Sequence, residues 1–131
     1  MHSRPLQETD LETILPWWLV RGEGDMPPDI LPPIAAVACD EDGPVAAAWL
    51  YEPHGCRVAI VDWLVTRPGL RPAYTRAACR LVLDFLTIHA SARGARVIFA
   101  SVTRRGALRE AEAAGFQVCA TACTHLVKHL P

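Results

Sequence analysis

Two apolar stretches joined by one long helical pattern constrain the fold more than any other feature of this sequence. Residues 57–65 (RVAIVDWLV) and 95–102 (ARVIFASV) are apolar on both faces and predict two buried strands. Between them, residues 73–92 carry apolar side chains at helical spacing, and Gly94 follows as a stop signal. A helix that connects two strands of one sheet is a crossover, so we expect the two strands to be parallel. The helix face expected to be buried consists of Ala77, Ala78, Leu81, Val82, Phe85 and Ile88.

Antiparallel strands are expected on the N-terminal side of this crossover. Residues 2–6 alternate weakly between apolar and polar side chains, which is typical of a short strand. Residues 34–40 and 44–52 flank Glu41-Asp42-Gly43, and an Asp-Gly pair between two apolar runs indicates a tight hairpin. We therefore expect a mixed, mostly antiparallel sheet that contains a central parallel pair of strands.

Three further segments complete the expected fold. Thr9 and Glu12 match a capping box, with Thr9 as the N-cap of a helix that Pro16 should break or kink. The pattern over residues 107–115 predicts a short helix, and residues 116–129 predict a closing strand or hairpin. The fold class is therefore α/β (α+β), with helices that flank the sheet.

Length and composition are those of one compact domain with its own core. We expect a single domain over residues 1–131, because a chain of 131 residues is too short for two. The hydrophobic fraction of 51% excludes a disordered chain. No run of 18 apolar residues is present, and the first ten residues lack an apolar signal core. These features predict a cytoplasmic protein with no membrane partner.

The five cysteines do not predict a metal site. They are odd in number and contain no Cys-x-x-Cys pair, so we interpret them as small hydrophobic residues. Cys119, Cys123 and His125 share one face of the expected closing strand. However, four strand residues span about 13 Å, which is too far for both cysteines to bind one ion unless the strand turns between them.

The net charge of −1 hides a strong asymmetry along the chain. Residues 1–62 contain 3 basic and 11 acidic side chains, a balance of −8, whereas residues 63–131 contain 10 basic and 3 acidic ones, a balance of +7. Twelve of the thirteen basic residues are arginine, which suits phosphate recognition, although a GC-rich coding bias gives the same result. The second half therefore suits anions. Nucleic acid is not the expected partner, because no nucleic-acid motif occurs and aromatic residues do not alternate with the arginines.

The turn TRPGLRPAYTR, over residues 66–76, is the segment best suited to bind an anion. The first crossover strand ends there and the long helix begins, so backbone N–H groups point out of the turn. Arg67, Arg71, Arg76 and Arg80 cluster at this helix start. They would either neutralise phosphate groups or form a solvated helix face.

The order of elements, together with these motifs, resembles the Gcn5-related N-acetyltransferase superfamily, most strongly over residues 43–116. In that family a strand with the pattern acid–Leu–x–Val–x–Pro precedes an Arg/Gln-x-x-Gly-x-Gly/Ala loop, and a later short helix ends in Gly-Phe. Here the strand supplies residues 61–65, with Pro68 one position later than usual. Arg71 falls at the Arg/Gln position, and Gly115-Phe116 follows the last expected helix.

The chain departs from the family pattern at the cofactor loop and at one catalytic position. Tyr74 and Arg76 stand where the family has two small residues, and Pro72 removes one backbone N–H donor. The frequent tyrosine acid of the family, four residues before the Gly-Phe pair, corresponds to Ala111. The resemblance implies acetyl-CoA as cofactor, bound by Leu64, Val65, Thr66, Arg71, Tyr74, Thr75 and Arg76.

Asp62 is the strongest candidate for a catalytic residue. It shares one face of a strand with apolar side chains, where a carboxylate costs free energy unless it is paired or opens into a cleft. It is either a general base that deprotonates an amine, directly or through water, or the partner of an arginine in the turn. Glu52, at the end of the preceding strand, is a second candidate. Tyr74 is a proton donor, a cover for the pocket mouth, or simply a structural tyrosine.

Two functions from different classes remain open on the sequence. The first is an acyl-CoA-dependent N-acyltransferase that acts on a small amine near residues 16–33, where Glu23, Asp25 and Asp29 would suit a cation. The second is a non-catalytic binding or assembly protein of the same fold, similar in style to short chains encoded by bacteriophages. A homodimer is compatible with both.

Overall fold

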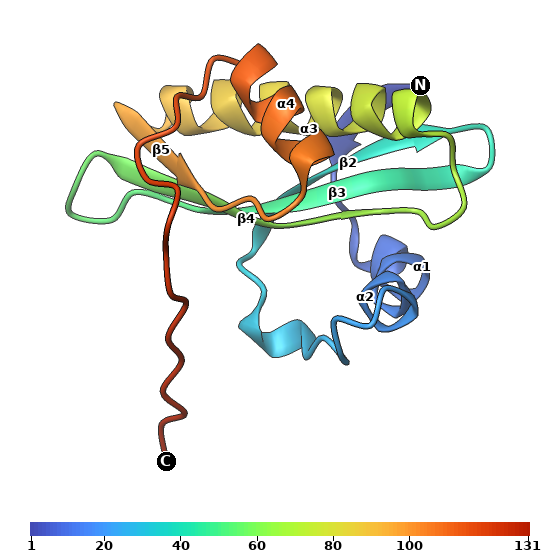
Figure 1. The fold of residues 1–131 in the computed structure, drawn as a ribbon, viewed down its shortest axis with the longest axis horizontal. Coiled ribbons are helices and arrows are strands. Elements are labelled where there is room, and N and C mark those ends of the chain that lie inside the picture. The colour runs from blue at the N-terminus through green and yellow to red at the C-terminus, as the bar shows by residue number, and fades with distance from the viewer.

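A five-stranded sheet in the order β1-β2-β3-β4-β5 forms the centre of the computed structural model, which describes all of residues 1–131 (Figure 1). The strands are β1 (His2–Pro5), β2 (Ile34–Asp40), β3 (Gly43–Tyr51), β4 (Val58–Thr66) and β5 (Val97–Ala100). Strands β1 to β4 pair antiparallel, and β5 pairs parallel to β4. The expected mixed, mostly antiparallel sheet and its parallel pair are therefore confirmed.

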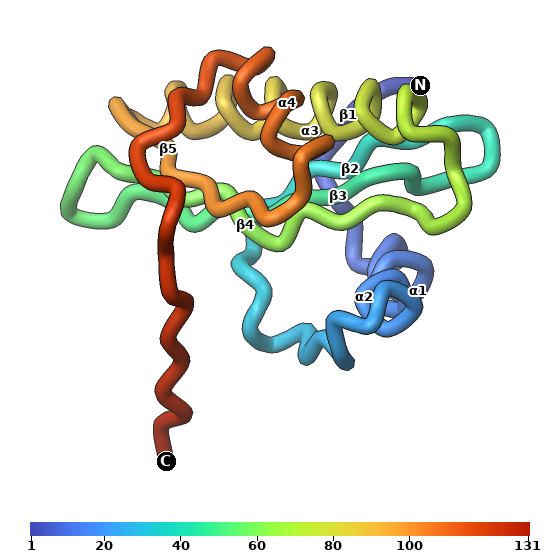
Figure 2. The backbone as a smooth tube through the Cα atoms, viewed as in Figure 1, coloured from blue at the N-terminus to red at the C-terminus, as the bar shows by residue number.

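Helices cover both faces of the sheet. The two longer ones, α3 (Pro72–Ala92) and α4 (Arg105–Ala113), lie on one face, and the short α1 (Leu11–Ile14) and α2 (Pro16–Val20) lie on the other (Figures 1 and 2). Short 3-10 turns occur at Glu8–Asp10 and Pro28–Ile30. None of the helices combines the length and the apolar content that crossing a bilayer requires.

Alternation along β3 produces a separate core on each face. Leu50 points toward α3 and packs with Leu86 in a cluster of 14 buried residues. Trp49 points the other way and packs with Ile14 and Trp18 in a cluster of 10 buried residues. The rings of Trp18 and Trp49 are tilted by 45°, with 5.5 Å between their centroids. Packing on both faces therefore holds the strands of the sheet in place.

The buried face of α3 differs from the expected one. The buried side chains are Ala78, Cys79, Val82, Leu83, Leu86 and Ala90. Of the expected set, Ile88 is 71% exposed and Ala77 is not buried either, whereas Leu81 and Phe85 flank the core. The helix carries apolar side chains on a broad arc, so its pattern leaves the orientation open by about one residue, and packing against the sheet selects it.

The N-terminal capping also differs in detail. Asp10, rather than Glu12, closes the motif: its Oδ2 accepts the backbone N–H of Gln7 at 2.8 Å and also pairs with Arg4 at 2.8 Å. The N-cap is therefore Gln7 and not Thr9. The break expected at Pro16 is confirmed, because α1 ends at Ile14 and α2 begins at Pro16.

The closing strand expected over residues 116–129 is wrong. No helix or strand occurs after α4, and residues 117–131 form an extended tail whose end lies away from the sheet (Figure 1). The outer edge of β5 therefore has no neighbour, and Val97 and Phe99 are 47% and 52% exposed. An alternating pattern favours an extended backbone, but a strand forms only where it pairs with an edge, and the tail does not pair with the open edge of β5.

Candidate functional site

The candidate site begins where β4 and β5 stop pairing. Their register runs from Val58 opposite Val97 to Val61 opposite Ala100, and β5 ends there while β4 continues to Thr66. The chain after β5 turns instead toward the start of α4. The second half of β4 therefore has no strand neighbour on that side.

A β-bulge changes the direction of β4 at this same point. Asp62 pairs with Trp49 and Val65 with Ala47, so two residues of β4, Trp63 and Leu64, stand opposite one residue of β3. Trp63 has a φ of 61°, and one oxygen of Asp62 accepts its backbone N–H at 2.7 Å. The Trp63 indole N–H donates to the Tyr51 hydroxyl at 2.9 Å. Asp62 is thus a structural acceptor as well as a candidate base.

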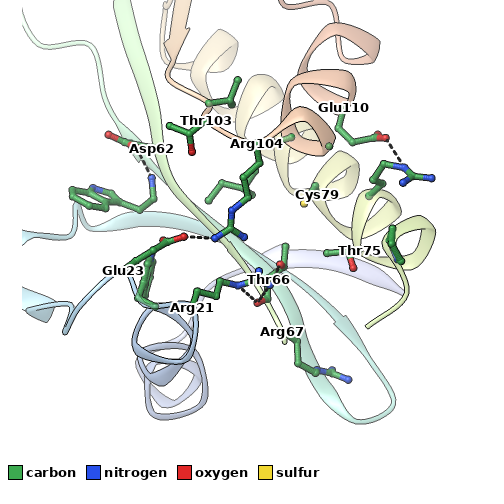
Figure 3. A pocket seen from close by; sticks show the side chains of 18 of the residues that line it. Arg21, Glu23, Asp62, Thr66, Arg67, Thr75, Cys79, Thr103, Arg104 and Glu110 are labelled. Atoms are coloured by element: carbon green, nitrogen blue, oxygen red, sulfur yellow. Dashed lines mark hydrogen bonds and ion pairs between the residues drawn. The ribbon is translucent and has the colours of Figure 1, made fainter. Parts of the chain in front are cut away.

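A cavity of about 680 Å³ opens where the two strands separate. Its wall includes Trp18 and Met26 from the side of α2. It also includes Thr75 and Cys79 from α3 and Glu110 from α4 (Figure 3). Because α2 and α3 lie on opposite faces of the sheet, the cavity is lined from both faces. Its volume is in the range typical of small-molecule sites.

Four arginines line this cavity, and two of them are held by carboxylates away from its centre. Arg67 pairs with Asp40 at 2.8 Å and donates to the Pro44 carbonyl at 2.9 Å. Arg76 pairs with Glu110 at 3.5 Å and so links α3 to α4. These contacts fix the start of α3 against the β2–β3 hairpin and against α4.

The other two arginines, Arg21 and Arg104, come from opposite walls. Arg21 follows α2, and its Nη2 donates to the Thr66 carbonyl at 2.8 Å and also to the Thr66 hydroxyl. It forms no ion pair. Burial lowers the pKa of Arg21, and the nearby charge of Arg104 lowers it further. Arg104 reaches across the cavity and pairs with Glu23 (Figure 3).

Cys79 contributes a neutral thiol to the cavity wall. Burial raises the pKa of Cys79 to about 11, and the negative charge of Glu110 adds to this effect. A thiol with this pKa stays protonated at neutral pH and is a poor nucleophile. Cys79 therefore serves as a small apolar wall residue.

The structure brings five of the expected site residues to the cavity: Asp62, Leu64, Thr66, Thr75 and Arg76. Val65 points away from it and is buried with Trp49 beside α2. Arg71 is the exposed N-cap residue of α3 and does not line the cavity.

Two of the expected catalytic residues lie elsewhere. The Tyr74 hydroxyl donates to Asp40 at 2.8 Å, on the outer side of the α3 start. Glu52 pairs with His89 at 3.4 Å and with Arg93 at 3.5 Å, near the other end of α3. Neither residue lines the cavity. Local spacing could not reveal this, because both orientations depend on partners that are distant in the sequence.

Arg21, Trp63 and Cys79 line the cavity although the sequence analysis did not single them out. Arg21 had one available signal, since it is a lone cation between the apolar pattern of residues 14–20 and an acidic loop. Trp63 and Cys79 had none, because apolar residues in a strand and a helix look like core.

Comparisons with known proteins show what this arrangement is similar to. No protein-family model matches the chain, and no curated protein matches it. Several solved structures do. TTHA1254 from Thermus thermophilus has a TM-score of 0.75 at 16% identity, with 100% of both chains covered. An acetyltransferase from Trypanosoma brucei has a TM-score of 0.72 at 18% identity, covering 96% of this chain and 99% of that one.

A third similar structure was solved with a ligand. The aminoglycoside N-acetyltransferase AAC(6')-Iy, in complex with CoA, has a TM-score of 0.62 at 16% identity, covering 97% of this chain and 99% of that one. The chain thus has the Gcn5-related N-acetyltransferase fold, as the resemblance implied. At such low identities the likeness establishes the fold alone. Nothing in these comparisons supports an association with bacteriophages.

Proposed function

We propose that this protein is an acyl-CoA-dependent N-acyltransferase that acts on a small amine. The observation that carries the proposal is the cavity between β4 and β5, which is lined from both faces of the sheet. Two reactants can approach one point from opposite sides of such a cavity, as direct transfer from a thioester to an amine requires. The acetyltransferase names of similar structures support the same class of reaction.

The open edge of β4 fits the arm of acetyl-CoA. Beyond Val61 this edge has no strand neighbour on the cavity side. Apart from the Trp63 N–H and the Thr66 carbonyl, which are bound to Asp62 and Arg21, its backbone groups are available to an extended chain of amides such as the pantetheine arm. Leu64 and Thr66 would lie along that arm. When bound, the cofactor supplies an acyl group activated as a thioester.

The start of α3 fits the phosphates of the cofactor. Gly69 lines the cavity just before this helix, and no heavy atom lies within 4 Å of the position that a Cβ on Gly69 would take. Tyr74 and Arg76 replace the small residues of the family, but the Tyr74 side chain is bound to Asp40 and Arg76 is turned toward α4. Neither therefore covers the approach to Gly69.

Asp62 is the side chain that we assign to proton removal from the amine. Its carboxylate lines the cavity, and only one of its oxygens is used, by the Trp63 N–H. The second oxygen is available to accept a proton, directly or through one water. The cavity wall contains no tyrosine but does contain His125 from the tail, and we assign protonation of the leaving thiolate to no single side chain.

The test combines cofactor binding with turnover in matched variants. Wild type and Asp62→Asn should bind acetyl-CoA with similar affinity by calorimetry, because an amide oxygen can still accept the Trp63 N–H. In a screen of small amines that measures CoA release, Asp62→Asn should lower kcat about 100-fold. Asp84→Asn is the matched control, because Asp84 is exposed and pairs only with Arg80.

Two results would contradict the proposal. Absence of acetyl-CoA binding at millimolar concentration would mean that acetyl-CoA is not the cofactor. Equal turnover in Asp62→Asn and wild type would mean that Asp62 is not the base, while the rest of the proposal would remain.

A non-catalytic binding or assembly protein is the second candidate, and the unpaired edge of β5 favours it. Val97 and Phe99 are exposed there, and an open strand edge is a surface on which another chain can add a strand. A protein that fails to bind acetyl-CoA but forms dimers in sedimentation experiments would fit this function.

A further inference from the structure

The part of the cavity next to α2 contains an anion site that the protein fills with its own carboxylate. Arg21 and Arg104 converge there from opposite walls, and Glu23 is the carboxylate that pairs with Arg104 (Figure 3). The negative charge of Glu23 also acts on Arg21, in the direction that raises the pKa of Arg21. Two guanidinium groups thus lie near one carboxylate, which pairs only with Arg104, and this leaves an excess of positive charge at this point.

Both arginines retain donors for a ligand. The Nη2 and Nε atoms of Arg21 donate to Thr66, at 2.8 and 3.3 Å from its carbonyl oxygen, whereas Nη1 has no partner. The anchored guanidinium is thus oriented in advance, which lowers the entropy cost of binding an oxyanion. Arg104 uses one nitrogen for Glu23, and its side chain is 50% exposed.

The backbone around Glu23 allows its side chain to move away from Arg104. It lies between Gly22 and Gly24, which have φ values of 72° and 89°, in a loop without helix or strand. Its side chain is 43% exposed, and an ion pair this exposed contributes little to stability. A ligand oxyanion can therefore replace Glu23 at small cost.

The loop acids do not form a cation site. Of the three acids expected to attract a cationic acceptor, only Glu23 lines the cavity, and Arg104 neutralises it. Asp25 and Asp29 are exposed outside the cavity. The charge left over on this side of the cavity is positive.

We propose that the acceptor amine carries an acidic group, a carboxylate or a phosphate, which Arg21 and Arg104 bind in place of Glu23. This inference rests on the proposed function for its choice of ligand. The start of α3, on the other side of the sheet, is the place for the cofactor phosphates, so the α2 side is left for the acceptor. Bound there, the acidic group would hold the amine of the same molecule near Asp62 and the thioester.

The test uses amines that differ only in this acidic group. A panel of free amino acids and the corresponding amino acid amides is titrated by calorimetry into wild type, Arg104→Gln, Glu23→Gln and Arg105→Gln, with CoA present. Wild type should bind the acids at least about tenfold more tightly than the amides, as a charge-assisted hydrogen bond predicts. Arg104→Gln should lose this preference, and Glu23→Gln should bind the acids more tightly than wild type does.

The controls separate this inference from the proposed function. Arg105→Gln should behave as wild type, because Arg105 is exposed and does not line the cavity. Acetyl-CoA affinity should change less than about threefold in Arg104→Gln. If it falls as much as the affinity for acids, the anion belongs to the cofactor and the inference is wrong.

Two further outcomes are decisive. Equal affinity of acids and amides in wild type, or no binding of any acid in the panel, would overturn the inference even if acetyl-CoA binds. Conversely, a protein that does not bind acetyl-CoA but keeps the acid preference, lost in Arg104→Gln, would retain the anion site and lose the proposed enzyme activity.

Discussion

Trp63 shows how one residue shapes the site. It is the only residue other than glycine with a positive φ, 61°, and such a conformation costs about 1 kcal/mol or more. The neighbouring Asp62 accepts its N–H, and Tyr51 accepts its indole N–H, so both ends of the residue are held. The resulting bulge bends β4 at the point where β5 stops pairing. A local strain therefore marks the entrance to the cavity.

Asp40 makes stability depend on pH in the acid range. Arg67 above all, and then Tyr74, hold the pKa of Asp40 at about 2, below its ordinary value of 3.8. Because the folded state has the lower pKa, this stabilisation is complete above pH 3.8 and is lost as the pH falls toward 2. We expect the urea midpoint to fall between about pH 4 and pH 2, and to fall less in Asp40→Asn.

An equal fall in wild type and Asp40→Asn would contradict this prediction. The loss would then come from other carboxyl groups. Asp10 is the first to test, because Arg4 lowers the pKa of Asp10.

At the scale of elements, the two strands of the crossover occupy different positions in the sheet. β4 lies between two strands and carries the bulge, whereas β5 is a four-residue edge strand. The separation of the two depends on where β5 ends, because its pairing stops at Ala100. A longer β5 would close the gap and remove the cavity, so the shortness of this strand is what makes a site.

The orientation of α3 can be tested with a matched pair of substitutions. Leu86→Ala should lower the free energy of unfolding by about 2–5 kcal/mol, because Leu86 is fully buried against the sheet. Ile88→Ala should change it by no more than about 0.5 kcal/mol, because Ile88 is 71% exposed. Urea unfolding measures both. The reverse order would mean that α3 presents the face expected from the sequence.

At the scale of the whole molecule, ion pairs within the chain partly compensate the charge asymmetry between its two halves. Three arginine ion pairs join the acidic first half to the basic second half: Arg67–Asp40, Arg93–Glu52 and Arg104–Glu23. The two halves thus meet within one chain. Of the four arginines that line the cavity, only Arg21 forms no ion pair.

Cofactor binding should be visible as stabilisation of the whole molecule. A ligand that binds only the folded state at one hundred times its Kd stabilises it by about 2.7 kcal/mol. We therefore expect acetyl-CoA to raise the thermal midpoint by about 10 °C, measured by calorimetry. Adenosine triphosphate is the control, since it shares the phosphates but lacks the pantetheine arm. Equal shifts with both ligands would mean that the edge of β4 does not contribute to binding.

The sequence predicted most elements because their signals are local. The β2–β3 hairpin has its Asp-Gly turn, and the break at Pro16 follows from the missing N–H of proline. The order of strand, helix and strand made β4 and β5 parallel, since a crossover leaves no other arrangement. Asp62 stood out for a similar reason, as a carboxylate in an apolar strand.

Tertiary structure decided what local signals could not. Tyr74 and Glu52 face partners 34 and 37 residues away, so no spacing rule could exclude them from the cavity. The tail after α4 has the alternation of a strand but does not pair with the open edge of β5, and Arg21 enters the site only because α2 packs beneath β4. Backbone propensity and turn chemistry act within a few residues, whereas burial and ion pairing depend on which surfaces meet. The sequence by itself therefore determined the elements and their order, and the packing of the sheet decided which side chains form the site.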